Sequence, residues 1–507
     1  MSRHAGAWQR PAARTLLLHC RWLVPPLGSL ALTALATGGA VPTGARITLL
    51  ALMLSFAAVT AAGLARWSRT RYRLTADTFE LHSGVLSRRR RTIPLHRVRN
   101  VDLTATALHR ALGLTVVRAG TTASNGEQDA ITLDAVTLRE AHRLRAALLA
   151  HADAQADARP AELSRLHWRW LRYAPCTFWV FGGVGVAAGT VYRIFDGMGI
   201  ELWRTPFVQQ LFAALGHRAL WLTVPAALIT VTALGSLGAL ALYTENWWGY
   251  RAAWTDADTL TVRRGLLTTR SVALERSRLY GALLREPLLL RAAGGASVTA
   301  VAGGLGDAEE AHARGALLPP APRDEALRAV TGALRMAADR VDSVPLTPHP
   351  RAALRRRTVR GLLFAVLPGT VALLVPGVLL SPAFLHAAWI HALVATAVTQ
   401  LLARDAYKSL GHALHGRHLL VRAGTFSRDT LVLERSAISA WTFSTSPFTR
   451  RSGLVTLTAA VAAGKHAYHL RDLAADDAVA VAVTARAGIV EEFLEPVGRP
   501  GGPRSGE

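Results

Sequence analysis

The chain has 507 residues, of which 51% are hydrophobic and 18% are charged, and its 58 Lys and Arg outnumber 34 Asp and Glu for a formal net charge of +24. An apolar chain with so basic a balance indicates nucleic-acid binding or an anionic membrane surface, and its long apolar segments favour the membrane. The two cysteines, Cys20 and Cys176, are too few for a disulfide framework or a zinc knuckle.

Six segments are long and apolar enough to cross a membrane, which takes about 20 mostly apolar residues. They cover residues 23–41, 47–65, 173–195, 219–243, 361–380 and 384–403, and none has an acidic residue in its middle. Arg14 and Arg21 precede the first segment, so a cleaved signal peptide is conceivable. We expect the segment to be retained as a span, because the second follows almost at once and the later pairs repeat the arrangement.

The spans form three pairs, and charge distinguishes the two sides of each pair. Within the pairs, the connectors 42–46, 196–218 and 381–383 are short or weakly charged. Basic residues gather outside the pairs, as at Arg66 and Arg169. The positive-inside rule therefore places both termini and all long segments in the cytoplasm. We predict a multi-pass protein of the plasma (inner) membrane.

The soluble segments that follow the pairs repeat one pattern. Each has an alternating strand that ends in a glycine, at Gly84, Gly265 or Gly424. A second strand ends at Arg97, Arg276 or Arg435, and a later loop carries Arg110, Arg285 or Arg450. Because these arginines recur within one chain, we expect a shared structural task, and hydrogen bonds that anchor the segment are favoured over ligand contact. Short strands with a C-terminal helix predict an antiparallel barrel or sandwich.

On these residues the sequence resembles the YdbT-type bacterial membrane proteins, which are built from membrane-flanked bacterial pleckstrin-homology (PH)-like domains. The resemblance rests on Tyr72-Arg-Leu-Thr, Asp77-x-Phe79-x-Leu81-x-x-Gly84, Arg91-Thr-Ile-Pro-Leu-His-Arg-Val98 and Leu112-Gly-Leu114. The first and third copies match well. The middle copy departs from the pattern, with Ala273 in place of Pro94 and a Pro-flanked insertion at about residues 307–350.

The resemblance implies a membrane α + β fold with six transmembrane helices in three pairs. Each pair is followed by a PH-like antiparallel β-barrel or sandwich with a C-terminal helix. The helix pairs are expected at residues 14–66, 172–246 and 358–404. The PH-like domains are expected at 67–152, 247–345 (divergent) and 405–495, and a disordered tail at 496–507.

The basic run Arg88, Arg89, Arg90 and Arg91 is the sharpest local feature. Arginine forks suit phosphate oxygens, so the run could contact an anionic lipid headgroup. Nonspecific attraction to anionic lipid, at about 1 kcal/mol per charge, is the favoured interpretation, and a protein-binding surface is a third. The other two segments lack such a run.

The sequence favours a non-enzymatic function without a cofactor. It has no Gly-x-Ser-x-Gly, no His-Glu-x-x-His and no phosphate-binding loop. His386 and His391 are five apart and therefore lie on different helix faces, so we interpret them as packing residues. The favoured hypothesis is a scaffold or partner-binding protein in envelope maintenance that presents cytoplasmic PH-like domains. The alternatives are a transporter subunit or an anionic-lipid-binding protein, and a membrane enzyme is a further, less favoured hypothesis.

The expected partners follow from the same patterns. They are the lipid bilayer, anionic lipid headgroups, and another membrane-flanked PH-like protein. Nucleic acid is not expected, because the basic residues follow the membrane-proximal ends of the spans rather than one recognition helix.

Overall fold

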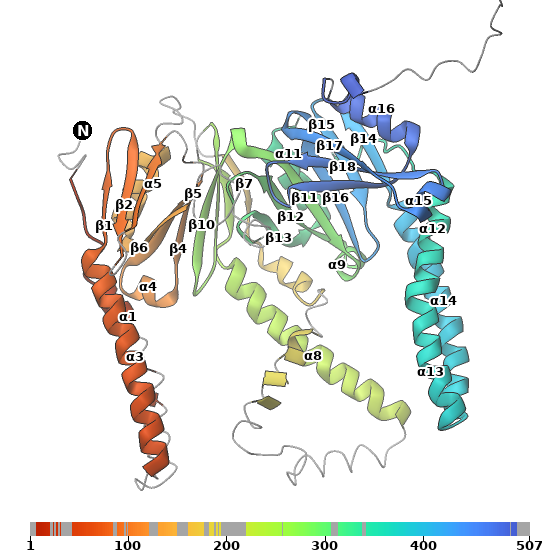
Figure 1. Ribbon diagram of the computed structural model, residues 1–507, viewed down its shortest axis with the longest axis horizontal. Coiled ribbons are helices and arrows are strands. Elements are labelled where there is room, and N and C mark those ends of the chain that lie inside the picture. The colour runs from red at the N-terminus through yellow and green to blue at the C-terminus, as the bar shows by residue number, and fades with distance from the viewer. Residues whose placement is uncertain are drawn as a thin grey trace, which may run out of the picture. The chain divides into compact units, whose positions relative to one another are not determined.

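The structure is a computed structural model of the chain. It describes residues 7–493 apart from 21–23, 25–26, 29–30, 32–42, 85–88, 96–97, 99, 121–129, 150–160, 177–181, 187–188, 191, 194–219, 256, 306–312, 337–340 and 487. The chain divides into two compact units (Figure 1). Unit 1 is Met1–Arg278 with Gly303–Glu310, and unit 2 is Leu279–Ala302 with Ala311–Glu507.

Four helical segments in the described residues are long and apolar enough to span a membrane. They are Leu50–Arg69, Pro225–Trp247, Arg351–Leu379 and Ala383–Lys408. Only 6–11% of each segment's apolar window is buried by protein, so lipid is the natural solvent for these surfaces. They confirm the predicted spans 47–65, 219–243, 361–380 and 384–403. The predicted spans 23–41 and 173–195 lie largely outside the described residues, so six spans remain a prediction.

The third helix pair packs through a row of glycines. It consists of α12 (Arg351–Gly361), a π-helical turn (Leu362–Val366) and α13 (Leu367–Leu379), which pack against α14 (Ala383–Lys408). Gly361, Gly369 and Gly377 recur every eight residues along the first helix. A Cβ at Gly369 would lie 2.5 Å from the ring of His391, and one at Gly377 would lie 2.7 Å from Leu385. Glycine is therefore what allows the two helices to approach closely.

Unit 1 contains two antiparallel sheets, with strand orders β1-β2-β3 and β6-β5-β4-β10-β9-β8-β7. The strands are β1 (Arg71–Leu74), β2 (Thr78–Ser83), β3 (Arg89–Pro94), β4 (Asn100–Ala105), β5 (Leu114–Gly120), β6 (Ala130–Thr137), β7 (Ala161–Arg165), β8 (Arg251–Trp254), β9 (Thr259–Arg264) and β10 (Thr269–Glu275). The helices are α1 (Thr15–Cys20), α3 (Thr43–Arg69), α4 (Ala107–Ala111), α5 (Leu138–Leu149) and α8 (Leu220–Trp247), with 3₁₀ turns at Trp168–Tyr173 and Arg276–Arg278.

Unit 2 also contains two antiparallel sheets, with strand orders β13-β12-β11-β16-β15-β14 and β17-β18-β19. The strands are β11 (Leu279–Pro287), β12 (Gly295–Ala302), β13 (Ala316–Pro322), β14 (Gly411–His415), β15 (His418–Ala423), β16 (Ser427–Glu434), β17 (Ile438–Ser444), β18 (Leu454–Val461) and β19 (Ala467–Ala474). Besides the span helices it has α9 (Leu288–Ala292), α11 (Arg323–Leu334), α15 (Pro447–Arg451) and α16 (Ala475–Ala485), with 3₁₀ turns at Arg435–Ala437 and Glu491–Phe493.

The first and third soluble segments each enclose a hydrophobic core. In the first segment, Phe79 and Ile131 from the two sheets meet Ala141 and Leu148 of α5. In the third, β15, β16, β18 and β19 close around a core that α16 completes with Ala478 and other residues. In both segments, therefore, alternating inward residues of two short sheets and one helix stripe bury each other, as the sequence predicted.

The sheets differ from the prediction in one respect, because they do not stop at the ends of the soluble segments. β4 of the first segment pairs with β10 of the middle segment, and β11 of the middle segment pairs with β16 of the third (Figure 1). The division between the two compact units falls at Arg278 and Leu279, inside the residues 247–345 predicted as one domain. Strand pairing between distant segments is a non-local contact, which local patterns do not encode.

Candidate functional site

A cavity of about 920 Å³ lies in unit 2 where the third helix pair meets the third soluble segment. Its walls come from α12, the π-helical turn and α14 on one side, and from the β15–β16 turn, β18 and β19 on the other. Five cationic side chains line it, against two carboxylates; they are Arg356, Arg357, Arg360, Lys465 and Arg471, against Asp429 and Asp472. Apolar residues, among them Phe364 and Leu402, complete the lining on the span side.

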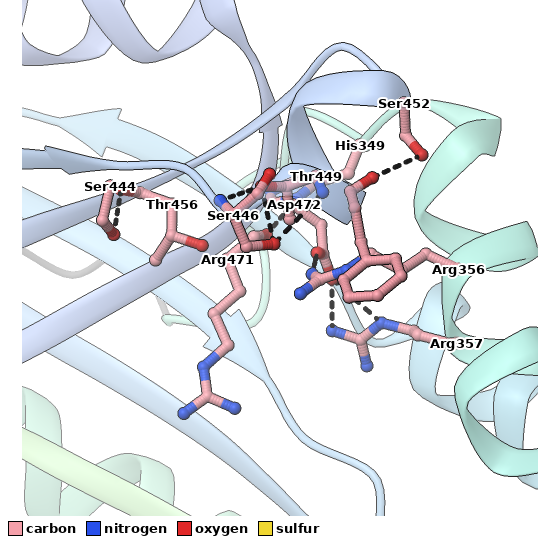
Figure 2. Close-up of polar contacts among 11 residues, drawn as sticks. His349, Arg356, Arg357, Ser444, Ser446, Thr449, Ser452, Thr456, Arg471 and Asp472 are labelled. Carbon is pink, nitrogen blue, oxygen red and sulfur yellow. Dashed lines mark hydrogen bonds and ion pairs between the residues drawn. The ribbon is translucent and has the colours of Figure 1, made fainter. Parts of the chain in front are cut away.

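Asp472 forms a buried ion pair that joins β19 to α12. Its side chain is 4% exposed, and its backbone has a left-handed φ of 64°. One carboxylate oxygen accepts a hydrogen bond from Arg356, and the other accepts from Nε and Nη2 of Arg357 at 3.3 and 3.2 Å (Figure 2). A buried carboxylate is tolerated only when it is paired in this way, so these two arginines are structural anchors rather than free ligands.

Two histidines lie beside this ion pair. Nδ1 of His349 is 3.0 Å from the carbonyl oxygen of Arg471, and Nε2 of His349 is 3.3 Å from Nδ1 of His412. If His349 donates to that carbonyl, its Nε2 is left to accept from His412, which requires the His349 ring to be neutral. Burial lowers the pKa of both side chains, and that of His412 falls to about 4. The pair therefore fastens residues 347–349 to β14 without adding charge to the cavity.

The remaining three cations of the cavity are available to a ligand. Within the described residues, Arg360, Lys465 and Arg471 form no ion pair with a carboxylate, although Lys465 lies near enough to Asp429 to attract it. Figure 2 shows the Arg471 side chain extending away from the Asp472 ion pair. The cavity therefore combines uncompensated positive charge with an apolar wall at the end of a membrane span. Phosphate on an alkyl chain is the ligand chemistry that fits such a lining.

The backbone of the span is irregular beside the cavity. The π-helical turn Leu362–Val366 supplies Phe364 and Ala365 to its lining. Pro368 follows two residues later and has no N–H to donate to the carbonyl of Phe364, which disrupts the regular ladder at this point. Single π-helical turns of this kind occur frequently at functional sites.

The predicted arginine run lies elsewhere, on the outer strand β3 of unit 1. Arg88 falls outside the described residues, while Arg89, Arg90 and Arg91 lie on β3. Arg90 and Arg73 both pair with the buried Glu80, at 3.2 and 3.0 Å. The hydrogen bond from Arg73 is the main reason that the pKa of Glu80 is lowered.

The three repeated glycines occupy equivalent turns. Gly84, Gly265 and Gly424 end the second strand of each segment with left-handed φ values of 118°, 111° and 139°. A Cβ at Gly265 would overlap the carbonyl oxygen of Thr268, and one at Gly424 would overlap that of Ser427. Only glycine fits this turn without strain.

The first set of repeated arginines is placed with a shift. The Arg276 and Arg435 backbone N–H groups donate to the carbonyls of Asp258 and Arg417, and in the first segment that of Leu95 donates to Asp77 in the same way. Leu95 therefore occupies the predicted position of Arg97, which falls outside the described residues. The Arg435 side chain donates to the Thr484, Ala485 and Gly416 carbonyls, which ties the end of α16 to the sandwich.

The second set is also placed with a shift. Arg110 and Arg450 each lie three residues before a left-handed glycine, at Gly113 and Gly453. In the middle segment this place belongs to Arg291, three residues before Gly294, whereas Arg285 lies on β11. Arg110 donates to the carbonyl of Leu266, and Arg291 to Asp405 at 2.7 Å.

The sequence did not indicate the cavity as a site. Arg356, Arg357 and Arg360 were visible only as part of a basic cluster that the positive-inside rule already explains. Asp472 is separated from them by more than a hundred residues, so no local pattern links it to these arginines. Among the described residues, no group of three His, Cys, Asp or Glu side chains is arranged to hold a metal ion.

Comparisons with known proteins agree with this architecture. The bacterial PH domain family (bPH_2) matches residues 26–152 and 362–487, the first and third copies. The UPF0699 transmembrane protein YdbT of Bacillus subtilis (strain 168) is 20% identical over 454 residues, which is 85% of this chain and 87% of that protein. No solved structure matches the chain. The chain is therefore a transmembrane protein with repeated bacterial PH domains that is YdbT-like over most of its length.

Proposed function

We propose that this protein is a non-enzymatic membrane scaffold that presents its PH-like segments to partner proteins at the cytoplasmic face of the plasma membrane. The observation that carries the proposal is the pairing of strands across the helix pairs. β4 and β10 belong to one sheet although the second helix pair separates them in sequence, and β11 and β16 belong to one sheet although the third pair separates them.

This pairing supports the topology that the charge pattern predicts. Strands can hydrogen-bond only on one side of a bilayer, so an even number of spans must separate β4 from β10 and β11 from β16. Two candidate spans lie between β11 and β16, as required. One lies between β4 and β10 in the described residues, which supports the predicted span 173–195 as its partner. The positive-inside rule then favours the cytoplasm for all three segments.

The scaffold proposal is tested by recovering partners from native membranes. Crosslinking followed by affinity purification of the full chain should recover a specific membrane protein in stoichiometric amount. A spans-only version of the chain, residues 351–410, is the control that separates binding by the PH-like segments from co-solubilised lipid and neighbours. Recovery of the same proteins by that control, or of none by the full chain, would contradict a scaffold.

A second candidate function, recognition of an anionic phospholipid, is favoured by the cavity in unit 2. Arg360, Lys465 and Arg471 line it and form no ion pair in the described residues, and Phe364 and Leu402 offer an apolar wall. The triple variant Arg360→Gln, Lys465→Gln, Arg471→Gln in nanodiscs should lose selective retention of phosphatidylglycerol over phosphatidylcholine. Inorganic phosphate as competitor distinguishes a headgroup site from a free-phosphate site. Equal loss on replacing Arg89–Arg91 by Gln would indicate plain electrostatic attraction.

A further inference from the structure

Two strand pairings join consecutive soluble segments, β4 with β10 and β11 with β16, and these two junctions share one register. At the first, Arg270 of β10 lies opposite Thr104 of β4. At the second, Asp429 of β16 lies opposite Arg285 of β11. Arg270 and Asp429 each lie five residues before the end of their strand. Thr104 and Arg285 each lie nine residues before the left-handed glycine that follows the next short helix, Gly113 or Gly294. Equivalent positions of the repeat are therefore paired at both junctions.

Pairing at this register decides how deeply the fourth strand of a segment is buried. Val101 and Leu103 on β4 are 0% and 5% exposed, and Ala282 and Leu284 on β11 are 0% and 1% exposed. β17 is the corresponding strand of the third segment, and most of it is exposed, with Phe443 at 41%. Within the described residues, therefore, no following segment covers β17.

A short helix follows the fourth strand of each segment (α4, α9 or α15), and its arginine also distinguishes the third segment from the other two. Arg110 and Arg291 each bond to the segment that follows, through the carbonyl of Leu266 and the carboxylate of Asp405. Arg450 holds this position on α15 and is exposed. In the described part of the chain its side chain forms no hydrogen bond or ion pair, as expected if the segment that it serves lies on another molecule.

One strand of each kind that pairs at the junctions lies at an open sheet edge within the described residues. β17 forms one edge of the sheet β17-β18-β19, and β3 forms one edge of β1-β2-β3. β3 is the first-segment counterpart of β10 and β16, the strands that pair at the two junctions. An open edge of unpaired backbone groups favours addition of a strand.

We propose that β17 binds β3 of a second copy of this chain, at the register of the two internal junctions. This places Arg89 opposite Ser444, Arg91 opposite Thr442 and Ile93 opposite Ala440. The proposal rests on the scaffold function and names its partner. It makes the association head-to-tail, so each copy offers one donor edge and one acceptor edge.

The chemistry of the two edges selects this pairing over the alternatives. β3 carries three consecutive arginines, so two β3 edges repel one another. β17 carries no charged residue, and its exposed Phe443 would lie opposite Arg90, which places an arginine beside an aromatic face. Both copies are held in one bilayer by their spans, which raises the effective concentration of each edge for the other.

Disulfide trapping tests the register directly. Two differently tagged full-length chains without Cys20 and Cys176 are co-expressed, one with Arg89→Cys and the other with Ser444→Cys. Directly opposite residues in antiparallel strands have Cα atoms about 4.5–5.5 Å apart, within disulfide range. A crosslinked heterodimer is expected. The slipped pair Arg89→Cys with Phe443→Cys is the matched negative control, and Thr104→Cys with Arg270→Cys in one chain is the positive control. Equal yields from the matched and slipped pairs would overturn the proposal.

Introducing a charge of either sign at one exposed position gives an independent readout. Thr442 faces Arg91 in the proposed pair, so Thr442→Arg should abolish co-purification of two differently tagged chains, whereas Thr442→Glu should retain it. Retention by both variants, or loss by both, would count against β3 as the bound strand. If Ser444→Cys traps a different membrane protein instead of a second copy, the scaffold function stands and the proposed partner is wrong.

Discussion

Arg285 on β11 lies directly opposite Asp429 on β16, with Nε and Oδ2 3.9 Å apart. The two residues come from different soluble segments that a helix pair separates in sequence. Their positions at the junction are those of Thr104 and Arg270 at the other junction. The relationship shows that the junction is defined by backbone register, because the side chains at the same place differ completely.

Reversing the charge of Arg285 should weaken the junction in unit 2. Arg285→Asp places two carboxylates opposite each other, at a cost of about 1 kcal/mol in unfolding free energy. The second change Asp429→Arg should restore most of it. Both side chains are partly exposed, so the effect should shrink in high salt. Thermal unfolding of the solubilised chain measures it, and a double variant no more stable than Arg285→Asp would show that the pair does not interact.

Removing the charge of Asp472 should loosen the third PH domain from its helix pair. Asp472→Asn keeps a residue that tolerates a left-handed backbone but leaves Arg356 and Arg357 without their buried carboxylate. We expect a loss of about 3 kcal/mol, the lower end for breaking a buried pair, because both arginines are partly exposed. Limited proteolysis at the buried Ser409 and Leu410, between α14 and β14, should accelerate. Arg471→Gln, at the neighbouring exposed residue, is the control and should change neither measurement.

The histidine pair should make the third PH domain sensitive to acid. Burial lowers the pKa of His412 from 6.5 to about 4, so the folded chain resists protonation that the unfolded chain accepts. The stability from this group is complete above pH 6.5 and is lost as the pH falls toward 4. Between pH 7.5 and pH 5 the loss should be about 2 kcal/mol. His412→Gln should flatten this dependence of the melting temperature, and an unchanged dependence would exclude His412 as its source.

The turn glycine of the third segment should tolerate no side chain. At Gly424 a Cβ would overlap the Ser427 carbonyl at a φ of 139°, whereas at Gly416, with a φ of 54°, no atom lies within 4 Å. Gly424→Ala should therefore cost at least about 1 kcal/mol more than Gly416→Ala. Urea unfolding measures both. Equal costs would mean that the β15–β16 turn differs from the one described.

The sequence predicted the features that local chemistry determines. Apolar length predicted the four candidate spans found in the described residues, and the glycines at 84, 265 and 424 predicted the turns that the structure places there. Equivalence between arginines was less secure, because Arg285 and Arg291 are both compatible with the pattern and only the left-handed Gly294 decides between them.

The junctions and the cavity could not be predicted from local patterns. An open strand edge has no sequence signature that names its partner, so the pairing of β4 with β10 appears only in three dimensions. The cavity depends on the pairing of Asp472 with arginines more than a hundred residues away in the sequence.

The central claim, that three PH-like segments stand together on the cytoplasmic face, is tested most directly by topology reporters. Fusions after residues 150, 345 and 507 each follow one soluble segment. A reporter that is active only in the cytoplasm then reports on which side of the membrane each segment lies. The account predicts a cytoplasmic signal from all three. A periplasmic signal from any one of them would contradict it, because strands on opposite faces of a bilayer cannot form the sheets that join β4 to β10 and β11 to β16.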